Sequence, residues 1–263
     1  MREKIDDFRL RENLLAKSLD SAARLKRFVA QSTNLQIVTA ESLTAGMISK
    51  TLADIPRWGE ALYGGFVVYD TDAKRQMLGV TTKGVYSETT ARQMARGAVV
   101  NTRASLGIAV TGNAMAYSDD LAAQGIVYIG ICVRLPDGAL SIASTTMHAC
   151  EDRDIASLCS HWKQGYSTGA FPSAAVTALI ADVVRLKTVF RACKFTLRAL
   201  KELVATHGSD FLLAQNVAMP KESYDHVCRP SGPLENHLQT GNQKQCAPKD
   251  ETLLPRSRRL GRG

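Results

Sequence analysis

Residues 39–46 read TAESLTAG and contain a serine, Ser42, whose surroundings suit a nucleophile. The short run QIV before this stretch predicts a strand, and the helical spacing of MISKTLADI after it predicts a helix. The polar residues therefore fall in a loop between a strand and a helix. There the Ser42 hydroxyl has two candidate roles: a helix cap worth about 1 kcal/mol, or a nucleophile beside a helix end that binds anions.

A serine hydroxyl becomes a good nucleophile only when a neighbour takes its proton. A lysine can do so if burial or a nearby cation lowers the lysine pKa. Tyr69 ends the strand-like run GGFVVYD, and Lys74 lies in the first turn of the helical run TDAKRQML, so both can point back at the Ser42 loop. Taken alone, a lysine such as Lys74 is more often a solvated surface residue, and a tyrosine such as Tyr69 is more often a half-buried packing residue.

The backbone amides of Thr44, Ala45 and Gly46 open the predicted helix. A helix N-terminus has N–H groups without a partner inside the helix and a partial positive charge. These amides are therefore suited to a phosphate or an oxyanion.

The elements around this loop alternate between helical and strand-like spacing. Residues 10–31 and 87–105 have apolar positions at helical intervals, whereas GIAVTG (107–112) and GIVYIGICV (125–133) are typical of buried strands. The turn at Pro136-Asp137-Gly138 predicts a hairpin. Strands that alternate with helices predict a layered α/β domain.

The C-terminal third carries most of the positive charge. The net charge of the 263-residue chain is +8, and residues 185–263 contain 14 Lys and Arg against 7 Asp and Glu. Such a segment suits a nucleic acid or an acidic protein partner, although a solvated basic tail without a partner explains it as well. Helical spacing continues over about 171–206, and the residues from about 214 onwards are poor in apolar runs, which predicts disorder.

Composition limits the class of protein. A hydrophobic fraction of 45% and a charged fraction of 22% are those of a globular chain. The six cysteines form no CxxC pair, which favours free thiols. The N-terminus is too charged for a signal peptide, and no run reaches the roughly 18 apolar residues that span a bilayer. We therefore expect a soluble protein of the cytoplasm or another reducing compartment, without membrane contact.

Five segments, in order, resemble the CinA C-terminal domain family, which includes the nicotinamide-mononucleotide (NMN) amidohydrolases, or NMN deamidases. They are TAESLTAG, GGFVVYDTDAKRQMLGV, GVYSETTARQMARGAV, AVTG and GIVYIGICV. The family patterns are approximately TAESCTGG, GFVTYSNEAK..LGV, G.VSEEVA..MA.GA, TGIAGP and VGTV. The resemblance runs from about Leu14 to about Arg153, with no inserted residue between Ser42 and Lys74.

The resemblance implies a fold and a chemistry. The fold is three-layered, α/β/α, around a mixed sheet. The chemistry is amide hydrolysis with Ser42 as nucleophile, Lys74 as base and then acid, and Tyr69 assisting proton transfer or orienting the ring. The predicted substrate-binding residues are Thr44, Ala45, Gly46, Thr111, Gly112 and Arg153. The resemblance also implies a homodimer acting on a nucleotide-like small molecule, with no metal or organic cofactor.

The sequence departs from the family pattern at several of these positions. Leu43 replaces the cysteine of ESCTGG, and Ala45 replaces the first glycine, which matters if that position has a positive φ. Asp70-Thr71 replaces Ser-Asn, and the Asp70 carboxylate is expected to raise the pKa of Lys74. NAMAYSDD (113–120) replaces the loop after TG, and EDR replaces GDR, leaving Arg153 as a candidate phosphate contact.

We therefore predict an α/β/α domain over residues 10–165, a helical extension over 166–210, and a basic, disordered tail over 211–263. The predicted function is hydrolysis of NMN to nicotinic acid mononucleotide and ammonia. The alternative is a catalytically inactive CinA-like domain that binds protein or nucleic acid through residues 185–263. The sequence leaves open whether the segment after residue 165 packs on the domain.

Overall fold

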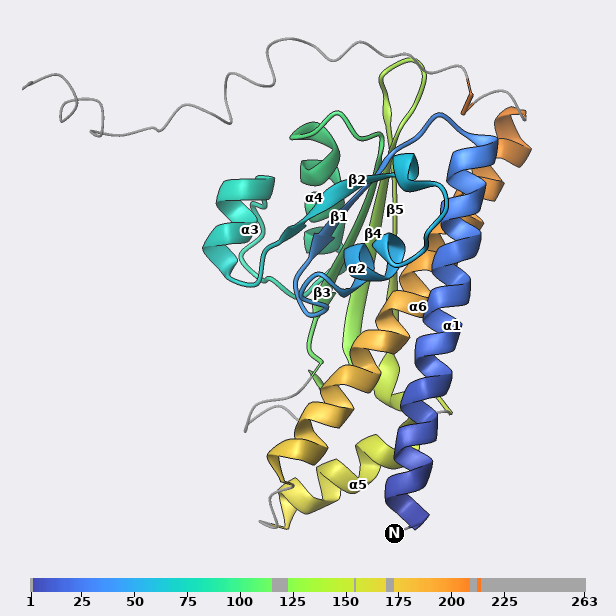
Figure 1. Ribbon diagram of the computed structural model, residues 1–263. Helices are drawn as coiled ribbons and strands as arrows, with labels where there is room; N and C mark the ends of the chain where they lie inside the picture. Colours follow the sequence, from blue (N-terminus) through green and yellow to red (C-terminus); the bar gives the residue numbers. More distant parts are fainter. Residues whose placement is uncertain (1, 115–122, 154, 169–172, 209–211, 214–263) are drawn as a thin grey trace, which may run out of the picture.

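The computed structural model describes residues 2–114, 123–153, 155–168, 173–208 and 212–213, which form a mixed sheet between two helical layers (Figure 1). The elements, in chain order, are α1 (Arg2–Ser32), β1 (Ile37–Glu41), α2 (Met47–Ala53), η1 (Gly59–Ala61), β2 (Leu62–Val67), α3 (Thr71–Leu78), α4 (Glu88–Val100), β3 (Leu106–Gly112), β4 (Ile126–Arg134), β5 (Leu140–His148), η3 (Ala149–Glu151), α5 (Ala156–Ser167) and α6 (Ala174–His207).

The five strands follow the order β2-β1-β3-β4-β5. Strands β2, β1 and β3 are parallel, with Glu41 opposite both Val67 and Val110, whereas β4 and β5 are each antiparallel to their neighbour. Because parallel strands in register end at the same edge of a sheet, the loops after β1, β2 and β3 lie side by side. This edge brings the loops of Ser42, Tyr69 and Gly112 together.

The sheet separates two hydrophobic cores. Helices α3 and α4 cover one face, while α1, α2 and α6 cover the other (Figure 1). Every residue of β1 and β3 is buried, as expected for central strands that have helices on both faces. The predicted three-layer α/β/α fold is confirmed. Among the described residues, no helix is long and apolar enough to cross a lipid bilayer.

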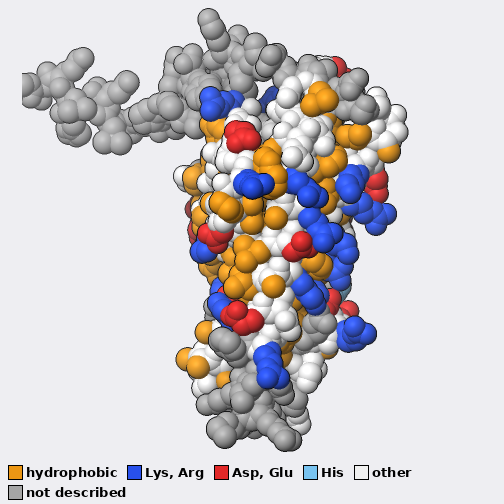
Figure 2. Space-filling model, turned by 45° about the vertical axis from the view of Figure 1, so that its right-hand side comes forward, with side chains coloured by type: hydrophobic (Ala, Val, Ile, Leu, Met, Phe, Trp, Pro, Cys, Tyr) orange, Lys and Arg blue, Asp and Glu red, His pale blue; other side chains and the backbone are white. Residues whose placement is uncertain are grey.

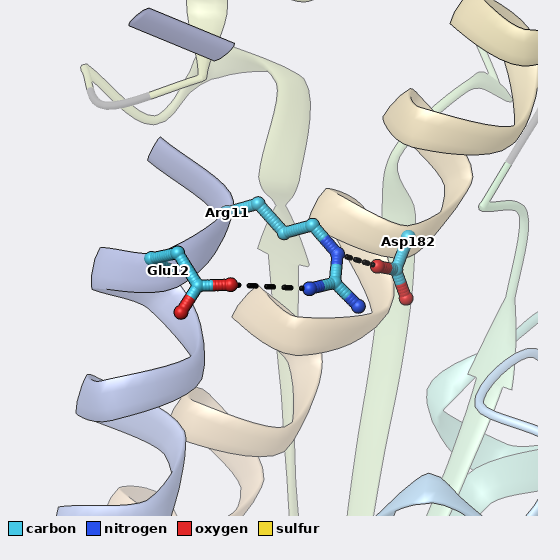
Figure 3. Close-up of polar contacts among 3 residues, drawn as sticks. All are labelled: Arg11, Glu12 and Asp182. Carbon is cyan, nitrogen blue, oxygen red and sulfur yellow. Dashed lines mark hydrogen bonds and ion pairs between the residues drawn. The ribbon is translucent and has the colours of Figure 1, made fainter. Parts of the chain in front are cut away.

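Helix α6 belongs to the core, which answers the question that the sequence left open. It runs parallel to α1 (Figure 1): the Ser18 hydroxyl donates to the carbonyl of Leu186 at 2.8 Å, and the Asn34 N–H donates to that of Leu212 at 3.0 Å. Near the start of the pair, Arg11 of α1 reaches Asp182 of α6, with Nε 2.6 Å from Oδ2 (Figure 3). The predicted tail lies outside the described residues, apart from 212 and 213.

The contact between α3 and α4 depends on Gly97. A Cβ added there would lie 2.0 Å from the carbonyl oxygen of Leu78. We expect Gly97→Ala to lower the free energy of unfolding by about 1–3 kcal/mol, because overpacking outweighs the gain in helix propensity. Urea unfolding followed by circular dichroism measures this. Gly84→Ala is the control, because a Cβ at Gly84 meets nothing within 4 Å; equal effects of the two changes would refute the packing argument.

Candidate functional site

A pocket of about 360 Å³ opens at the edge where β1, β2 and β3 end. Ser42 and Leu43 follow β1, Tyr69 follows β2, and Gly112 ends β3. Their meeting follows from the parallel register, and ligands of open α/β sheets commonly bind at the carboxyl ends of such strands. The full lining comprises Ser42, Leu43, Tyr69, Tyr86, Gly112, Asn113, Ala114, Ala174, Thr177, Ala178, Ala181 and Arg185.

The loop that carries Ser42 is tight. The Ala45 N–H donates to the carbonyl of Ser42 at 3.1 Å, and the Met47 N–H donates to that of Thr44 at 3.0 Å. Ala45 has a φ of 50° and Gly46 a φ of 93°, so both adopt the left-handed conformation. The position where the family pattern has glycine thus does have a positive φ, and Ala45 occupies it at some cost in backbone strain.

Glu41, rather than Ser42, caps helix α2. Its side chain is 0% exposed, and its carboxylate accepts from the N–H groups of Ile48 at 2.9 Å and Ser49 at 2.8 Å. The same carboxylate accepts from the hydroxyls of Thr39 and Thr44 at 2.9 and 2.8 Å. The first turn of α2 is therefore satisfied by a side chain of the protein, so an anion has fewer free amides there than the sequence suggested.

Ser42 lies at the wall of the pocket and is 4% exposed. Its N–H donates to the carbonyl of Val110 at 3.1 Å, which ties the loop to β3. Among the described residues, none forms a hydrogen bond with the Ser42 hydroxyl. Gly46 occupies the N-cap position of α2, and the side chain that binds the first N–H groups of the helix is that of Glu41. The capping interpretation of Ser42 is therefore excluded.

Lys74 is 1% exposed, and its Nζ donates to the backbone carbonyl of Tyr69 at 2.7 Å. Burial lowers the pKa of Lys74, and the nearby Asp70 carboxylate opposes this shift. The expected direction of the Asp70 effect is correct, but the desolvation effect is larger. Asp70 also caps α3 by accepting from the Asp72 N–H at 2.7 Å.

The structure connects Lys74 to the pocket only indirectly. The Tyr69 side chain is 65% exposed and lines the pocket, while its carbonyl holds Lys74. Lys74 itself is absent from the lining, and no hydrogen bond joins it to Ser42 in the described part of the chain. Direct proton transfer between them therefore requires the Lys74 amine and the Ser42 hydroxyl to come within hydrogen-bond distance.

Of the remaining predicted residues, Gly112 and Thr111 lie at or next to the Ser42 pocket, whereas Arg153 does not line it. Gly112 lines the Ser42 pocket with a φ of 144°, and a Cβ there would lie 2.2 Å from the Ile126 carbonyl oxygen. Thr111 is buried one residue earlier, and its hydroxyl donates to the carbonyl of Val85 at 2.7 Å. Arg153 instead lines a different pocket, so the structure does not bring it to Ser42. Of the rewritten loop, residues 115–120 lie outside the described part of the chain.

Arg185 of α6 is a site residue that sequence reasoning missed. Its Nε donates to the carbonyl of Leu43 at 2.8 Å, and its side chain lines the Ser42 pocket. It also borders a neighbouring hollow at Thr44–Lys50. No local pattern could identify it, because it lies 142 residues from its partner, and the sequence offered only the basic character of residues 185–263.

The described residues contain no ready-made metal site. No group of three or more His, Cys, Asp or Glu in the described ranges is placed to hold a metal ion. The four described cysteines, Cys132, Cys150, Cys159 and Cys193, are buried free thiols. The polar side chains in the lining of the Ser42 pocket carry hydroxyl groups, the amide of Asn113 and the guanidinium of Arg185.

The fold and the pocket define an α/β domain of the CinA type. A model of the CinA C-terminal domain matches residues 20–155, about half of the chain. The chain belongs to the CinA C-terminal domain family, and the resemblance found in the sequence is confirmed.

Comparisons with individual proteins agree with this assignment. A CinA-like protein of Chloroherpeton thalassium is 36% identical over 121 residues, which are 44% of this chain and 29% of that protein. The competence/damage inducible protein CihA of Agrobacterium tumefaciens has a similar structure, with a TM-score of 0.51 and 29% identity over 70% of this chain and 96% of that one. A competence or damage-inducible protein from Enterobacter asburiae has a TM-score of 0.50 and 25% identity. The match covers 71% of this chain and 98% of that one.

The match to curated relatives covers only part of their length. The aligned residues amount to 24% of a Streptococcus thermophilus relative and 29% of the C. thalassium protein.

Proposed function

We propose that this CinA domain hydrolyses the carboxamide of NMN, releasing ammonia and leaving nicotinic acid mononucleotide. The supporting observation is the convergence of Ser42, Tyr69, Gly112 and Arg185 on one pocket of about 360 Å³. This pocket contains a hydroxyl without a hydrogen-bond partner among the described residues, two tyrosine rings and a cation. These features suit a nucleotide that carries an amide group.

In the proposed reaction, the Ser42 Oγ attacks the carboxamide carbon while Lys74, in its neutral form, takes the hydroxyl proton. The C–N bond breaks, the proton passes to the leaving nitrogen, and ammonia departs. Water then hydrolyses the ester on Ser42 and gives the carboxylate. The Gly112 backbone and the amides of Thr44 and Gly46 are proposed to face the developing oxyanion or the phosphate.

Substrate recognition is assigned to the remaining walls of the pocket. Arg185 carries a guanidinium group whose Nε is already held by the Leu43 carbonyl. Its other nitrogens suit the phosphate of a mononucleotide, because a guanidinium forms paired charge-assisted hydrogen bonds with phosphate. The exposed rings of Tyr69 and Tyr86 provide faces for the pyridine ring.

The dependence of ammonia release on pH tests the assignment of the base. Because burial lowers the pKa of Lys74, the neutral amine forms below the ordinary lysine pKa of 10.5. We expect kcat/KM to rise about tenfold per pH unit below the Lys74 pKa and to level off above it. The midpoint should lie below 10.5.

Two variants make this experiment specific. Lys74→Met should lose at least about 100-fold in kcat/KM, the usual contribution of general base catalysis, together with the rise with pH. Lys83→Met removes an exposed lysine and should keep the wild-type profile. An unchanged pH profile in folded Lys74→Met would remove Lys74 from the mechanism.

The alternative is a catalytically inactive domain that binds protein or nucleic acid through residues 185–263. The lack of a direct contact between Ser42 and Lys74 favours it. Deleting all of 185–263 would not test it, because α6 packs on α1 and holds part of the core. Truncation after Leu213 keeps the packing of α6 on α1. If the domain is the proposed enzyme, the truncated chain should still release ammonia from NMN. If it is an inactive binding module, neither the full chain nor the truncated chain should release ammonia.

The homodimer implied by the family resemblance is part of the same proposal. Light scattering of the purified chain measures its mass in solution. A monomeric mass for an active preparation would remove the dimer from the proposal without affecting the proposed chemistry.

A further inference from the structure

A second and larger hollow, of about 660 Å³, lies between α6, β5 and η3. It shares no lining residue with the Ser42 pocket. The lining comprises Ile129, Thr145, Thr146, Met147, His148, Glu151, Asp152, Arg153, Arg191, Lys194, Phe195 and Arg198. The sequence predicted Arg153 as a substrate contact, but it lines this hollow and not the Ser42 pocket. The proposed amide hydrolysis gives the other lining residues no role. We call this hollow the β5 pocket.

The β5 pocket is built by the sheet edge and one stripe of α6. Ser144 and Thr146 of β5 donate to Glu88 of α4, at 2.7 and 2.6 Å, so they face the α4 layer. Because side chains alternate along a strand, Thr145 and Met147 face the opposite side, where α6 lies. On α6, positions 191, 194, 195 and 198 are spaced by three or four residues and thus share one face of the helix.

The charge of the β5 pocket is predominantly positive. Its walls contribute Arg153, Arg191, Lys194 and Arg198 against two carboxylates, Glu151 and Asp152. Asp152 is already bound by cations, with Oδ1 2.7 Å from the Nζ of Lys187 and Oδ2 3.2 Å from Arg191. Asp152 is therefore neutralised within the protein, and its pairing also occupies Arg191, while Arg198 is paired with Glu202 at 2.8 Å.

Two of the cations lack an acidic partner. Within the described residues, neither Arg153 nor Lys194 forms an ion pair with a carboxylate, and both are exposed. They come from different walls, one after η3 and the other from α6. The Nζ of Lys194 lies over the ring of Phe190, 5.7 Å from its centroid. In the face shown in Figure 2, Lys and Arg side chains gather along the right-hand side, beside hydrophobic side chains in the middle.

We propose that the β5 pocket binds a small ligand carrying two or more phosphate groups, of the nucleoside diphosphate class. Arg153 and Lys194 lie on two different walls, so each can donate to a different phosphate group of one ligand. Hydrogen bonds from cationic donors to phosphate are stronger than those between neutral groups. Ile129, Met147 and Phe195 give the pocket an apolar part that suits a nucleoside. A concave site of this volume favours a small ligand over the backbone of a nucleic acid, which follows an extended basic groove.

Isothermal titration of the full chain with ADP, and separately with inorganic pyrophosphate, tests this proposal. We expect ADP to bind, and Arg153→Gln and Lys194→Gln each to weaken binding by about tenfold or more. Lys201→Gln is the matched control, because Lys201 is exposed on the same helix but does not line the pocket. Circular dichroism verifies that each variant is folded.

Three results would overturn the proposal. The first is an absence of ADP binding to the wild type at millimolar concentration. The second is an equal affinity of ADP for the wild type and for the folded Arg153→Gln and Lys194→Gln variants, since the ligand then lies elsewhere. The third is tighter binding of a single-stranded oligonucleotide that the same two variants weaken, because the surface would then serve a nucleic acid. Ammonia release from NMN is measured in parallel, and its outcome does not decide this question.

Discussion

Ser42→Ala is expected to reduce ammonia release from NMN by at least about 1000-fold, to the level of a reaction without a nucleophile. In the proposed reaction this hydroxyl forms the ester with the substrate, so its loss removes the nucleophile. Its removal leaves the pocket, Arg185 and both tyrosine rings in place. Coupled measurement of ammonia with wild type and variant at equal concentration gives the ratio.

The control for this experiment is Thr177→Ala. Thr177 contributes another hydroxyl to the same pocket, but from α6, and it has no part in the proposed chemistry. Ser42→Ala should unfold near the wild-type temperature, because the Ser42 hydroxyl has no hydrogen-bond partner among the described residues. Thr177→Ala removes the acceptor of a 3.4 Å hydrogen bond from Trp162 Nε1, so a modest loss of stability is expected there. If wild type releases no ammonia, NMN hydrolysis is refuted. If Ser42→Ala remains active while folded, another group is the nucleophile.

Glu41→Ala is expected to lower the free energy of unfolding by about 3–6 kcal/mol, a large part of the 5–15 kcal/mol typical of a domain. The change removes the acceptor for two backbone N–H groups and two hydroxyls in a site that excludes water. Donors left buried without a partner cost about 1–3 kcal/mol each. The cavity left by the side chain adds to this loss.

Urea unfolding measures the Glu41 effect against a surface control. Glu12→Ala removes a carboxylate that is 48% exposed and lies 3.4 Å from Arg11 (Figure 3), and it should change stability by less than about 1 kcal/mol. A similar, small effect of both changes would show that the hydrogen bonds of Glu41 are replaced by water or by rearrangement. The loop of Ser42 rests on this carboxylate, so Glu41→Ala should also reduce activity.

The sequence by itself predicted the fold class and the place of the candidate site. The β-branched runs and the helical spacing predicted a layered α/β domain, because these patterns depend on neighbours along the chain. The resemblance of five segments to the CinA family implied the three layers around a mixed sheet. Ser42, Tyr69 and Gly112 were predicted at strand ends, and the parallel register of β1, β2 and β3 brings them together.

The tertiary structure decided the details that depend on distant residues. The Glu41 carboxylate binds the first N–H groups of α2, those of Ile48 and Ser49, because Glu41 is buried at the end of the central strand β1 beside them. The net direction of the Lys74 pKa shift depends on burial, which no local charge pattern shows. Arg185 reaches Leu43, and Arg153 lies in the β5 pocket, because α6 returns across the sheet from far along the chain. Local spacing predicts elements, but contacts across such separations are fixed only when the elements pack.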